Sequence, residues 1–362
     1  MTLRMVEYGS LLSCGGSRQW NGLVDLCPDA TIFQRFEWID SWWQTFRRED
    51  WKIRIFAAYE SGQLVGLAPF YERCSSEKRS PSLHLLGEEH ADYACVISRA
   101  GGRHIISALL RHVTAVVARR TRIYLDEVPR LSNLRRVLED SCHERPLHWV
   151  RVASTPCPWV AVRENTDATK ALLSKKSLRR HRMALSRLGR LSVSHEYDAT
   201  KIQKHLPKFF EQHVSRWSLS SYPSLFNNDL NQEFYRKLVV AFGPSRKIIF
   251  TTLMLDGCPI AYHFGFLSNS KLLWYKPTFD VRFSRYSPGE VLLGALIEYA
   301  LDHDLVALDF TRGDERFKNR FASKVSYNDS YVRFGWPAHA IKQRICDGIR
   351  TNIRQFRCIS RS

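Results

Sequence analysis

The stretch Tyr286–Phe321 combines three features that can together bind an anion. It opens with Ser287-Pro288-Gly289-Glu290, a helix-start signal in which serine is the N-cap residue, proline takes the first helical position and glutamate completes a capping box. The apolar run Leu305–Leu308 predicts a short buried strand that ends at Asp309. The turn that follows, Thr311-Arg312-Gly313-Asp314, carries a cation. A free helix N-terminus, a strand end and a cationic turn in one stretch suit an anionic cofactor.

A strongly basic segment, residues 174–190, is a second candidate site. One interpretation is a solvated basic face over a packed apolar stripe. The other is contact with an anion through residues such as Arg179 and Arg180, because like charges so dense on one short helix are costly unless something neutralises them. The helix itself is predicted by four residues that recur at helical spacing: Leu178, His181, Leu185 and Leu188.

The composition predicts a globular protein with an anionic partner. A chain of 362 residues favours two domains, and 44% hydrophobic residues exclude an intrinsically disordered chain. The net charge of +18, from 54 basic and 36 acidic residues, implies nucleic acid, a membrane surface or a phosphate-bearing ligand as partner. Charge alone does not choose among these three classes.

The cysteines and the apolar runs indicate a cytoplasmic protein without a metal site. The nine cysteines are odd in number and contain no Cys-x-x-Cys pair, so they are interpreted as reduced thiols. Cys142-His143 with His148 and Cys157 fits no standard zinc spacing. The longest apolar runs have the length of strands, which predicts no membrane span.

The expected elements occur twice in the same order. A hairpin that starts at Lys52 and turns at Ser61-Gly62 matches a hairpin that starts at Lys247 and turns at Asp256-Gly257. The aromatic helix Trp38–Phe46 precedes the first hairpin as Phe234–Ala241 precedes the second. Downstream, Ile123–Asp126 matches Val306–Asp309, so Asp126 is the expected counterpart of Asp309. Three matches in one order predict two copies of one α/β unit.

Two motifs resemble those of the GNAT superfamily, and more closely those of the CelD-type (BioF-like) acetyltransferases of bacterial polysaccharide clusters, relatives of the Fem peptidyltransferases. The likeness covers most of residues 30–335. Family members usually have tyrosine where Phe317 stands, and the glycines of the usual acyl-CoA loop are mostly absent from Arg282–Gly289. The motifs are Ser287-Pro288-Gly289-x-x-Leu292-Leu293 and Asp309-Phe310-x-Arg312-Gly313-Asp314-Glu315-x-Phe317-Lys318, with Leu178-Arg179-Arg180 as a third.

The resemblance implies an α/β fold of two tandem GNAT-like (acyl-CoA N-acyltransferase) units, with mixed sheets flanked by helices. Residues 1–165 are expected to form the N-terminal unit. Residues 166–337 are expected to form the C-terminal GNAT unit, with the basic helix 174–190 and the donor site. Residues 338–362, where isoleucines recur among basic residues, predict a basic amphipathic helix at the C-terminus.

The resemblance also implies roles for individual residues. A GNAT reaction moves an acyl group from a thioester to an amine, which requires a positioned donor, a base and an N–H that polarises the thioester carbonyl. Other roles stay open: Asp309 as an acceptor of loop amides, Lys318 as half of a surface ion pair and Tyr275 as a core aromatic. The expected catalytic residues are Asp309, Tyr275 and Lys318; the expected donor contacts are Arg282, Arg285, Ser287, Pro288, Gly289, Arg312 and Gly313; and the expected acceptor contacts are Arg179, Arg180, His90 and Asp92.

The sequence therefore predicts a GNAT-type N-acetyltransferase with acetyl-CoA or another acyl-CoA as co-substrate and no permanently bound cofactor. The expected acceptor is an amine or hydroxyl of a sugar or lipid-linked saccharide in polysaccharide biosynthesis, and peripheral contact with the inner face of an anionic membrane is left open. Two alternatives remain: a Fem-like peptidyltransferase that takes its aminoacyl group from tRNA, and a degenerate GNAT scaffold without activity.

Overall fold

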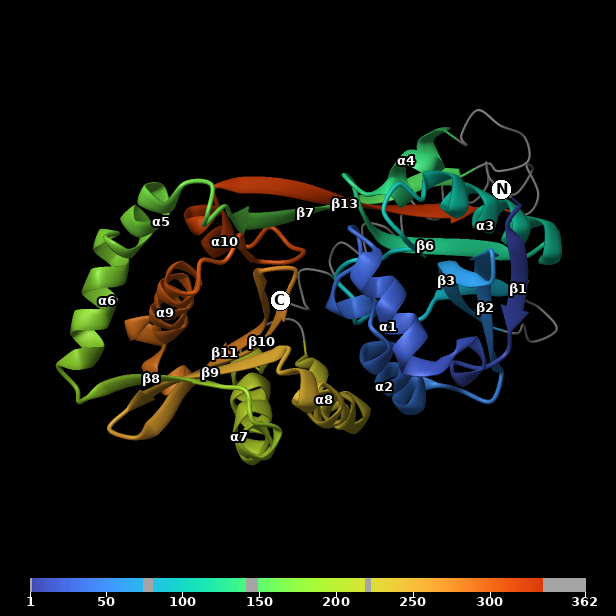
Figure 1. Ribbon diagram of the computed structural model, residues 1–362. Coiled ribbons are helices and arrows are strands. Elements are labelled where there is room, and N and C mark those ends of the chain that lie inside the picture. The colour runs from blue at the N-terminus through green and yellow to red at the C-terminus, as the bar shows by residue number, and fades with distance from the viewer. Residues whose placement is uncertain (1, 74–80, 141–148, 219–222, 335–362) are drawn as a thin grey trace. The chain divides into compact units, whose positions relative to one another are not determined.

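The computed structural model describes residues 2–73, 81–140, 149–218 and 223–334. They fall into two compact units (Figure 1). Unit 1 is Met1–Thr155 with the segment that begins at Tyr327, and unit 2 is Pro156–Ser326. The chain passes between the units inside two strands, β7 (Trp149–Val160) and β13 (Lys324–Arg333). The boundaries expected from the sequence at 165 and 337 stay a prediction, and the expected C-terminal helix 338–362 lies outside the described residues.

Unit 1 is a mixed sheet with the strand order β1-β2-β3-β4-β6-β13, and β5 pairs with β3. Helix α3 packs on β3, where Gly66 leaves room for the side chains of Ile105 and Leu109. Its strands are β1 (Arg4–Tyr8), β2 (Trp51–Glu60), β3 (Gln63–Arg73), β4 (Ser82–Leu85), β5 (Ile97–Ser98) and β6 (Arg122–Pro129). Its helices are α1 (Gly16–Leu26), α2 (Phe36–Phe46), α3 (Arg103–Val116) and α4 (Asn133–Asp140).

Unit 2 is a mixed sheet with the order β7-β12-β11-β10-β9-β8. Helix α9 packs on one face of the sheet, and α7 and α8 pack on the other. Its strands are β8 (Leu191–Glu196), β9 (Ile248–Leu255), β10 (Cys258–Ser268), β11 (Lys271–Phe279) and β12 (Ala307–Asp309). Its helices are α5 (Thr166–Leu173), α6 (Lys176–Ser186), α7 (Ala199–Trp217), α8 (Asp229–Phe242), α9 (Pro288–Asp302) and α10 (Arg316–Phe321), with a 3-10 turn η6 (Val281–Tyr286) before α9.

The two units share one topology, which confirms the repeat predicted from the sequence. In each unit a helix leads into an antiparallel hairpin, β2–β3 or β9–β10, and the third strand pairs antiparallel with the second. A helix, α3 or α9, then returns the chain to a strand that runs parallel to the third: β6 beside β4, and β12 beside β11. Each hairpin also gains an edge strand, β1 or β8.

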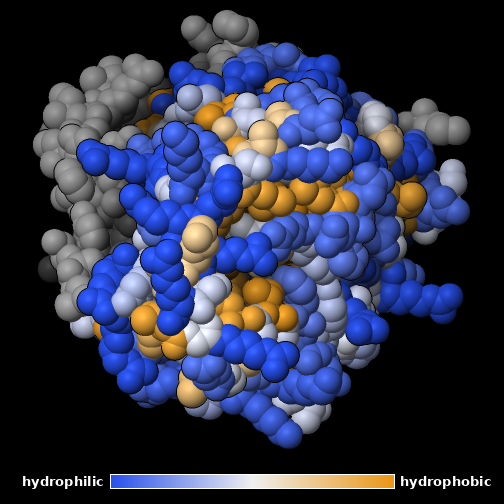
Figure 2. Space-filling view, turned by 90° about the vertical axis from the view of Figure 1, so that its left-hand side faces the viewer, coloured by the Kyte–Doolittle hydropathy of each residue, from blue (hydrophilic) through white to orange (hydrophobic). Residues whose placement is uncertain are grey.

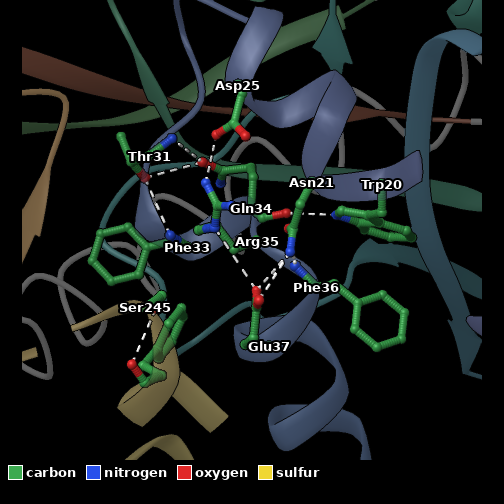
Figure 3. Close-up of polar contacts among 11 residues, drawn as sticks. Trp20, Asn21, Asp25, Thr31, Phe33, Gln34, Arg35, Phe36, Glu37 and Ser245 are labelled. Carbon is green, nitrogen blue, oxygen red and sulfur yellow. Dashed lines mark hydrogen bonds and ion pairs between the residues drawn. The ribbon is translucent and has the colours of Figure 1, made fainter. Parts of the chain in front are cut away.

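Local sequence signals fix the entrance to α2 in unit 1 (Figure 3). The side chain of Thr31 accepts a hydrogen bond from the Phe33 N–H, and the carboxamide oxygen of Gln34 accepts one from the Thr31 N–H. This reciprocal capping box ends the approach to α2, and the Glu37 carboxylate then accepts from Asn21 of α1. The aromatic helix expected at Trp38–Phe46 is therefore tied to α1 as well as packed on the sheet.

Two local features differ from what the sequence pattern favours. The apolar run Tyr93–Ile97 has the composition of a strand, but before β5 it is a buried loop in which the Ala94 N–H bonds to the Glu127 carbonyl outside any ladder. Leu188 was placed on the packed face of the basic helix, but α6 ends at Ser186 and Leu188 is 45% exposed. No helix of the described residues is both long and apolar enough to cross a membrane.

Candidate active site

The parallel strands β11 and β12 of unit 2 pair for only three residues and then diverge. Their register runs from Lys271 opposite Ala307 to Leu273 opposite Asp309. Beyond Asp309 the chain follows β7 instead, since the N–H groups of Phe310 and Gly313 bond to carbonyls of that strand. Strand β11 continues to Phe279, paired only with β10 among the described residues. One edge of residues 274–279 is therefore open between β11 and the turn after β12.

Polar groups in this open stretch lack partners inside the described part of the chain. The indole N–H of Trp274 and the hydroxyl of Thr278 are both buried and make no hydrogen bond there. Lys276, 8% exposed, is paired with Phe264, and Thr278 is paired with Tyr262, so both side chains lie on the face that packs on α7 and α8. A register shift precedes them, and Trp274 lies on the opposite face, stacked on His263 in the core beneath α9. Buried polar groups without partners are costly, which makes a ligand that supplies the missing bonds the natural explanation.

Two aromatic side chains from the turn after β12 line the inner end of the opening. The ring centroids of Phe310 and Phe317 lie 6.4 Å and 6.2 Å from that of Trp274. The family tyrosine replaced by Phe317 would place a hydroxyl here. The apolar lining suits the alkyl part of a ligand rather than its charged end.

The N-terminus of α9 follows directly after β11 and η6. Pro288 is its first residue, as predicted, but Ser287 makes no side-chain cap and takes a left-handed conformation at φ +49°. The expected capping box is therefore wrong. The Ser287 N–H donates to the Ser284 carbonyl, the Glu290 N–H donates to the Ser287 carbonyl, and proline has no N–H. Of the backbone amides in residues 287–290, only the Gly289 N–H is not used in a hydrogen bond of this turn. A Cβ at Gly289 would lie 3.4 Å from the ring of Phe279, at the end of the open strand.

The two arginines of η6 are exposed beside this helix end. Arg282 pairs with Asp280, with Nη2 2.6 Å from Oδ2, and this contact with Arg282 lowers the pKa of the Asp280 carboxyl. Arg285 bonds through Nη2 to the hydroxyl of Tyr286. Arg282 and Arg285 thus lie next to the 287–289 turn, with Arg282 already neutralised in part by Asp280.

Glu290 has a role that the sequence pattern did not indicate. Its carboxylate, 10% exposed, accepts a hydrogen bond from Ser177 of α6 at 2.7 Å and from Arg320 of α10 at 3.2 Å. His181 of α6 lies 3.6 Å from the same group. Tertiary partners therefore replaced the local capping box, and Glu290 joins the basic helix α6 to the start of α9 and to α10.

The turn between β12 and α10 is held by two buried charged side chains. Asp309, at the end of β12, accepts a hydrogen bond from the Thr311 N–H at 2.8 Å and so supports a residue with φ +56°. Lys318 is 2% exposed; its Nζ donates to the Arg312 carbonyl at 2.7 Å and lies 2.8 Å from Glu315 Oε2. Gly313 has φ +118°, and a Cβ there would lie 3.0 Å from Lys318 Nζ. In this structure Lys318 is a buried brace of the turn rather than half of a surface pair.

Arg216 of α7 reaches the open stretch of β11. Its Nη1 donates to the Pro277 carbonyl at 3.0 Å, and its guanidinium lies 4.7 Å from the centroid of the Phe279 ring. Burial lowers the pKa of Arg216 to about 10, and the nearby Glu315 carboxylate opposes that shift. The oxygens of Glu315 make no well-aligned hydrogen bond within the described residues. Among those residues, the cation in ion-pair contact with Glu315 is Lys318, with Nζ 2.8 Å from Oε2.

His213, one turn before Arg216, is held neutral. Burial lowers its pKa well below the ordinary value, and the positive charges of Arg216 and Lys276 lower it further. Trp217 Nε1 donates to His213 Nε2 at 3.1 Å, so the ring proton is on Nδ1 and is donated to Ser224 Oγ at 2.8 Å. This tautomer excludes His213 as a base for Ser224. The cations Arg216 and Lys318 thus lie near Glu315 and the neutral His213, a setting that suits an anionic ligand.

The remaining predicted residues lie in different surroundings. Tyr275 is buried on the α7–α8 face, with its ring centroid 5.4 Å from that of Phe266. Arg179 and Arg180 are exposed on α6. His90 and Asp92 belong to unit 1: His90 stacks on Phe46 and accepts from Trp42 Nε1, and Asp92 is 3% exposed.

The supposed counterpart of Asp309 is not equivalent to it. Asp126 lies inside β6, which continues to Pro129, whereas β12 ends at Asp309.

Sequence reasoning missed Arg216, Glu290 as a bridge and the free polar groups of Trp274 and Thr278. Glu290 and Ser177 are 113 positions apart, and Arg216 and Pro277 are 61 apart. The one available signal was Trp274-Tyr275-Lys276, since a lysine inside an otherwise apolar strand is unusual. Cys142, His143 and His148 of the weak metal pattern lie outside the described residues, among which no group of three metal-ligating side chains occurs.

Comparison with known proteins finds one family model that is similar to part of the C-terminal half. Residues 174–319 match the family model described as "Acetyltransferase (GNAT) domain". This match lies within unit 2 and supports the resemblance to the GNAT superfamily over that part of the chain. No curated protein matches the chain.

Solved structures show the same fold over most of the chain. FemX superposes with a TM-score of 0.61 at 13% identity, covering 90% of this chain and 96% of that one. A conserved protein of unknown function from Bacteroides thetaiotaomicron gives 0.54 at 12% identity, covering 87% and 96%. The C-terminal domain (DUF2156) of a proposed lysylphosphatidylglycerol synthetase from Agrobacterium fabrum gives 0.51 at 11%, covering 90% and 92%. The predicted fold class, a duplicated α/β fold with mixed sheets flanked by helices, is thus confirmed.

Proposed function

We propose that the GNAT domain of unit 2 transfers an acyl group from acyl-CoA, with acetyl-CoA as the expected donor, to an amine or hydroxyl of a sugar or lipid-linked saccharide. The observation that carries this proposal is the open edge of β11 at residues 274–279, which leads directly to the N-terminus of α9. An extended chain with amide groups can bond to an open strand edge as an added strand would. The pantetheine arm of coenzyme A has that shape and chemistry, and its diphosphate suits a helix N-terminus.

Each part of the acyl-CoA donor is assigned to a different group of residues. The diphosphate lies at the Gly289 N–H, with Arg285 and Arg282 supplying positive charge. The pantetheine arm follows β11, and the acyl end meets the apolar lining of Trp274, Phe310 and Phe317. Two features make up for the missing glycines of the usual loop. Ser287 takes the left-handed conformation and turns the chain without a glycine, and the two arginines of η6 supply positive charge.

The chemical step needs a proton acceptor and an N–H donor. The acceptor amine attacks the thioester carbonyl, the C–S bond breaks, and the ammonium proton passes to a carboxylate. Glu315 suits that role better than Asp309, because Asp309 already accepts from Thr311 whereas Glu315 Oε1 makes no hydrogen bond in the described residues. The unused indole N–H of Trp274 can polarise the carbonyl. Tyr275 stays the predicted source of the proton for the leaving thiolate, although its ring is buried on the α7–α8 face, across the sheet from Trp274. Lys318 keeps the turn and Glu315 in place.

The cationic cluster supports an acceptor that carries a negative charge. Arg216 lies beside the open strand edge, bonded to the Pro277 carbonyl, and the carboxylate of Glu315 near it already lies 2.8 Å from Lys318. A phosphate or carboxylate on the acceptor would supply the missing negative charge. Arg179 and Arg180 on α6 and, in unit 1, His90 and Asp92 remain proposed contacts of the acceptor.

Ligand-dependent thermal stability tests the donor. Acetyl-CoA is expected to raise the melting temperature, because a ligand that binds only the folded state stabilises it by mass action. Gly289→Trp, which forces a large side chain onto Phe279, is expected to abolish the shift, and Thr278→Val, which removes one hydroxyl at constant shape, is expected to reduce it. A control variant far from the site, Lys237→Gln, should keep the full shift. Absence of any shift at millimolar acetyl-CoA with the wild-type protein would falsify the proposal.

A Fem-like transferase that takes its aminoacyl group from tRNA is the second candidate, favoured by the FemX-like fold and the basic helix α6. It predicts binding of charged tRNA that falls steeply with salt, together with little binding of acetyl-CoA. A scaffold without activity predicts that neither donor binds. Native mass spectrometry against acyl-CoAs and aminoacyl-tRNA separates the three outcomes.

A further inference from the structure

The outward face of α6 is basic with an apolar residue at its centre. Lys176, Arg180, Met183 and Arg187 follow the i, i+4, i+7, i+11 spacing of one helical stripe, and Arg179 stands beside it. All five are exposed, whereas Leu178 and Leu185 on the opposite face are buried against unit 2. Met183 is 56% exposed, an unusual position for a large apolar side chain between cations.

Two more apolar side chains extend this surface. Leu188, just after α6, is 45% exposed, and Val193 of the edge strand β8 is 40% exposed. Figure 2 looks onto the side of unit 2 that carries α5, α6 and β8. It shows a mostly hydrophilic face in which hydrophobic side chains are visible between polar ones.

The positive charge of this face is not balanced by the protein. Residues 174–195 contain no aspartate or glutamate. The carboxylates that face α6 come from α9: Glu298 pairs with Arg182 at 2.9 Å, and Glu290 is taken up by Ser177 and Arg320. No described carboxylate pairs with Lys176, Arg179, Arg180 or Arg187. Like charges at this spacing destabilise a helix, so an external anion would relieve the repulsion.

We propose that the face formed by Lys176, Arg179, Arg180, Met183 and Arg187, with Leu188 and Val193 beside it, binds the surface of an anionic lipid bilayer. Clustered lysine and arginine attract anionic headgroups, and exposed apolar side chains between them enter the boundary of the acyl chains. A nucleic acid is the less suitable partner, because its phosphates would not cover Met183, Leu188 and Val193. Residues 174–195 also contain no Phe, Tyr or Trp on which unpaired bases could stack.

Such docking has a consequence for the acyl-transfer site. The inner side of α6 is fixed to the N-terminus of α9 through Ser177 and Glu290, so a bilayer bound to the outer side lies one helix away from the proposed donor site. A lipid-linked acceptor in that bilayer would be within reach of the enzyme. The docking itself does not depend on acyl transfer, because it is measured without donor or acceptor.

Vesicle binding by the full chain tests the proposal. We expect flotation with vesicles of phosphatidylcholine and phosphatidylglycerol, little flotation with phosphatidylcholine alone, and loss of binding at high salt. Lys176→Gln/Arg187→Gln should weaken the partition by about 30-fold, at about fivefold per cation, and Met183→Ser by about fivefold. The matched control Lys208→Gln/Lys237→Gln removes the same charge from α7 and α8, where both lysines pair with glutamates. Its partition should differ from that of the wild-type protein by less than twofold.

Several results would overturn the inference. One is equal binding to neutral and anionic vesicles, and another is an equal loss in the α6 pair and the control pair. Wild-type partition of the Met183→Ser protein would show that this face does not enter the bilayer. Salt-sensitive binding to tRNA without binding to anionic vesicles would assign the face to nucleic acid instead.

Discussion

His263 should make the stability of the protein depend on pH in a way that one substitution removes. Its ring is fully buried in β10 and stacks on Trp274, with centroids 4.9 Å apart and the planes 17° from parallel. Neither ring nitrogen makes a well-aligned hydrogen bond inside the described residues. Gly265 makes room for the ring, since a Cβ there would lie 2.0 Å from His263 Cε1. Burial lowers the pKa of His263 from 6.5 to about 3.

The direction and size of the effect follow from linkage. A folded pKa below the unfolded one means that the unfolded chain takes up the proton first, so stability is complete above pH 6.5 and is lost as pH falls towards 3. Between pH 7.5 and pH 5 the loss from this one group is about 2 kcal/mol, and it would reach nearly 5 kcal/mol if the fold survived below pH 3.

Urea unfolding of the wild-type protein and of His263→Phe, measured from pH 7.5 to pH 5, isolates this contribution. Phenylalanine keeps the stack on Trp274 but cannot take a proton. The difference in unfolding free energy between the two proteins should therefore change by about 2 kcal/mol in favour of the variant as pH falls. Any cost of the larger ring is constant with pH and cancels. Tyr262→Phe on the same strand is the control, because burial raises the pKa of Tyr262 away from this window. A wild-type–variant difference that stays constant with pH would refute the assignment of His263 as a buried neutral base.

Three further substitutions test the braces of the site. Glu290→Gln should lower the unfolding free energy by about 1–2 kcal/mol, because its bonds to Ser177 and Arg320 become weaker. The control Glu298→Gln, which breaks an exposed pair, should lower it by under about 0.5 kcal/mol. Denaturant titration compares the two variants, and equal losses would contradict the bridge from Glu290 to α6 and α10. Lys318→Met should lower the unfolding free energy by about 3 kcal/mol, because it leaves Glu315 without its cation. The control Lys324→Met, which breaks an exposed pair, should lower it little. A Lys318→Met melting temperature equal to that of the wild-type protein would show that Lys318 does not hold the turn. Arg216→Gln should reduce the stabilisation that sulfate or phosphate gives the wild-type protein, in melts at constant ionic strength, and an unchanged anion effect would exclude Arg216 from an anion site.

The sequence predicted those parts of the fold that depend on neighbours along the chain. Alternating apolar residues around Ser61-Gly62 and Asp256-Gly257 were enough for both hairpins, and proline at position 288 was enough for the start of α9. The duplication could also be predicted, because two copies of one local order leave the same signals twice.

The parts that were missed depend on contacts between distant segments. Ser287 and Glu290 have the residue types of a capping box, yet Glu290 binds Ser177 and Arg320, since a buried carboxylate gains more from a cation and a hydroxyl than from one exposed amide. Lys318 follows Glu315 at a spacing typical of a surface pair, and only the burial of the turn makes the pair internal. The unused N–H of Trp274 has no sequence signal at all, because partners that are absent leave no pattern.

The length of one strand distinguishes the two otherwise similar units. In unit 1 the parallel pair joins Ser82–His84 to β6, and β4 ends one residue later at Leu85. Glu88 then fills the space beyond it: although burial alone would raise its pKa, His84 and Arg73 lower it to about 2, and Tyr71 donates to it at 2.7 Å. In unit 2 the parallel pair ends at Leu273, but β11 continues to Phe279 with an open edge.

In unit 1, β4 ends one residue after its parallel pair with β6, and the Glu88 carboxylate beyond it is balanced by His84 and Arg73. Unit 1 therefore offers no open strand edge for an extended ligand and no excess of positive charge for the ligand's phosphates. If the proposed donor site is correct, duplication of the fold has not duplicated it, and one acetyl-CoA should bind per chain. Calorimetric titration that saturates at two acetyl-CoA molecules per chain would show that strand length is the wrong criterion, whereas saturation at one, lost in Gly289→Trp and retained when Glu88 is replaced by Gln, would place the site in unit 2.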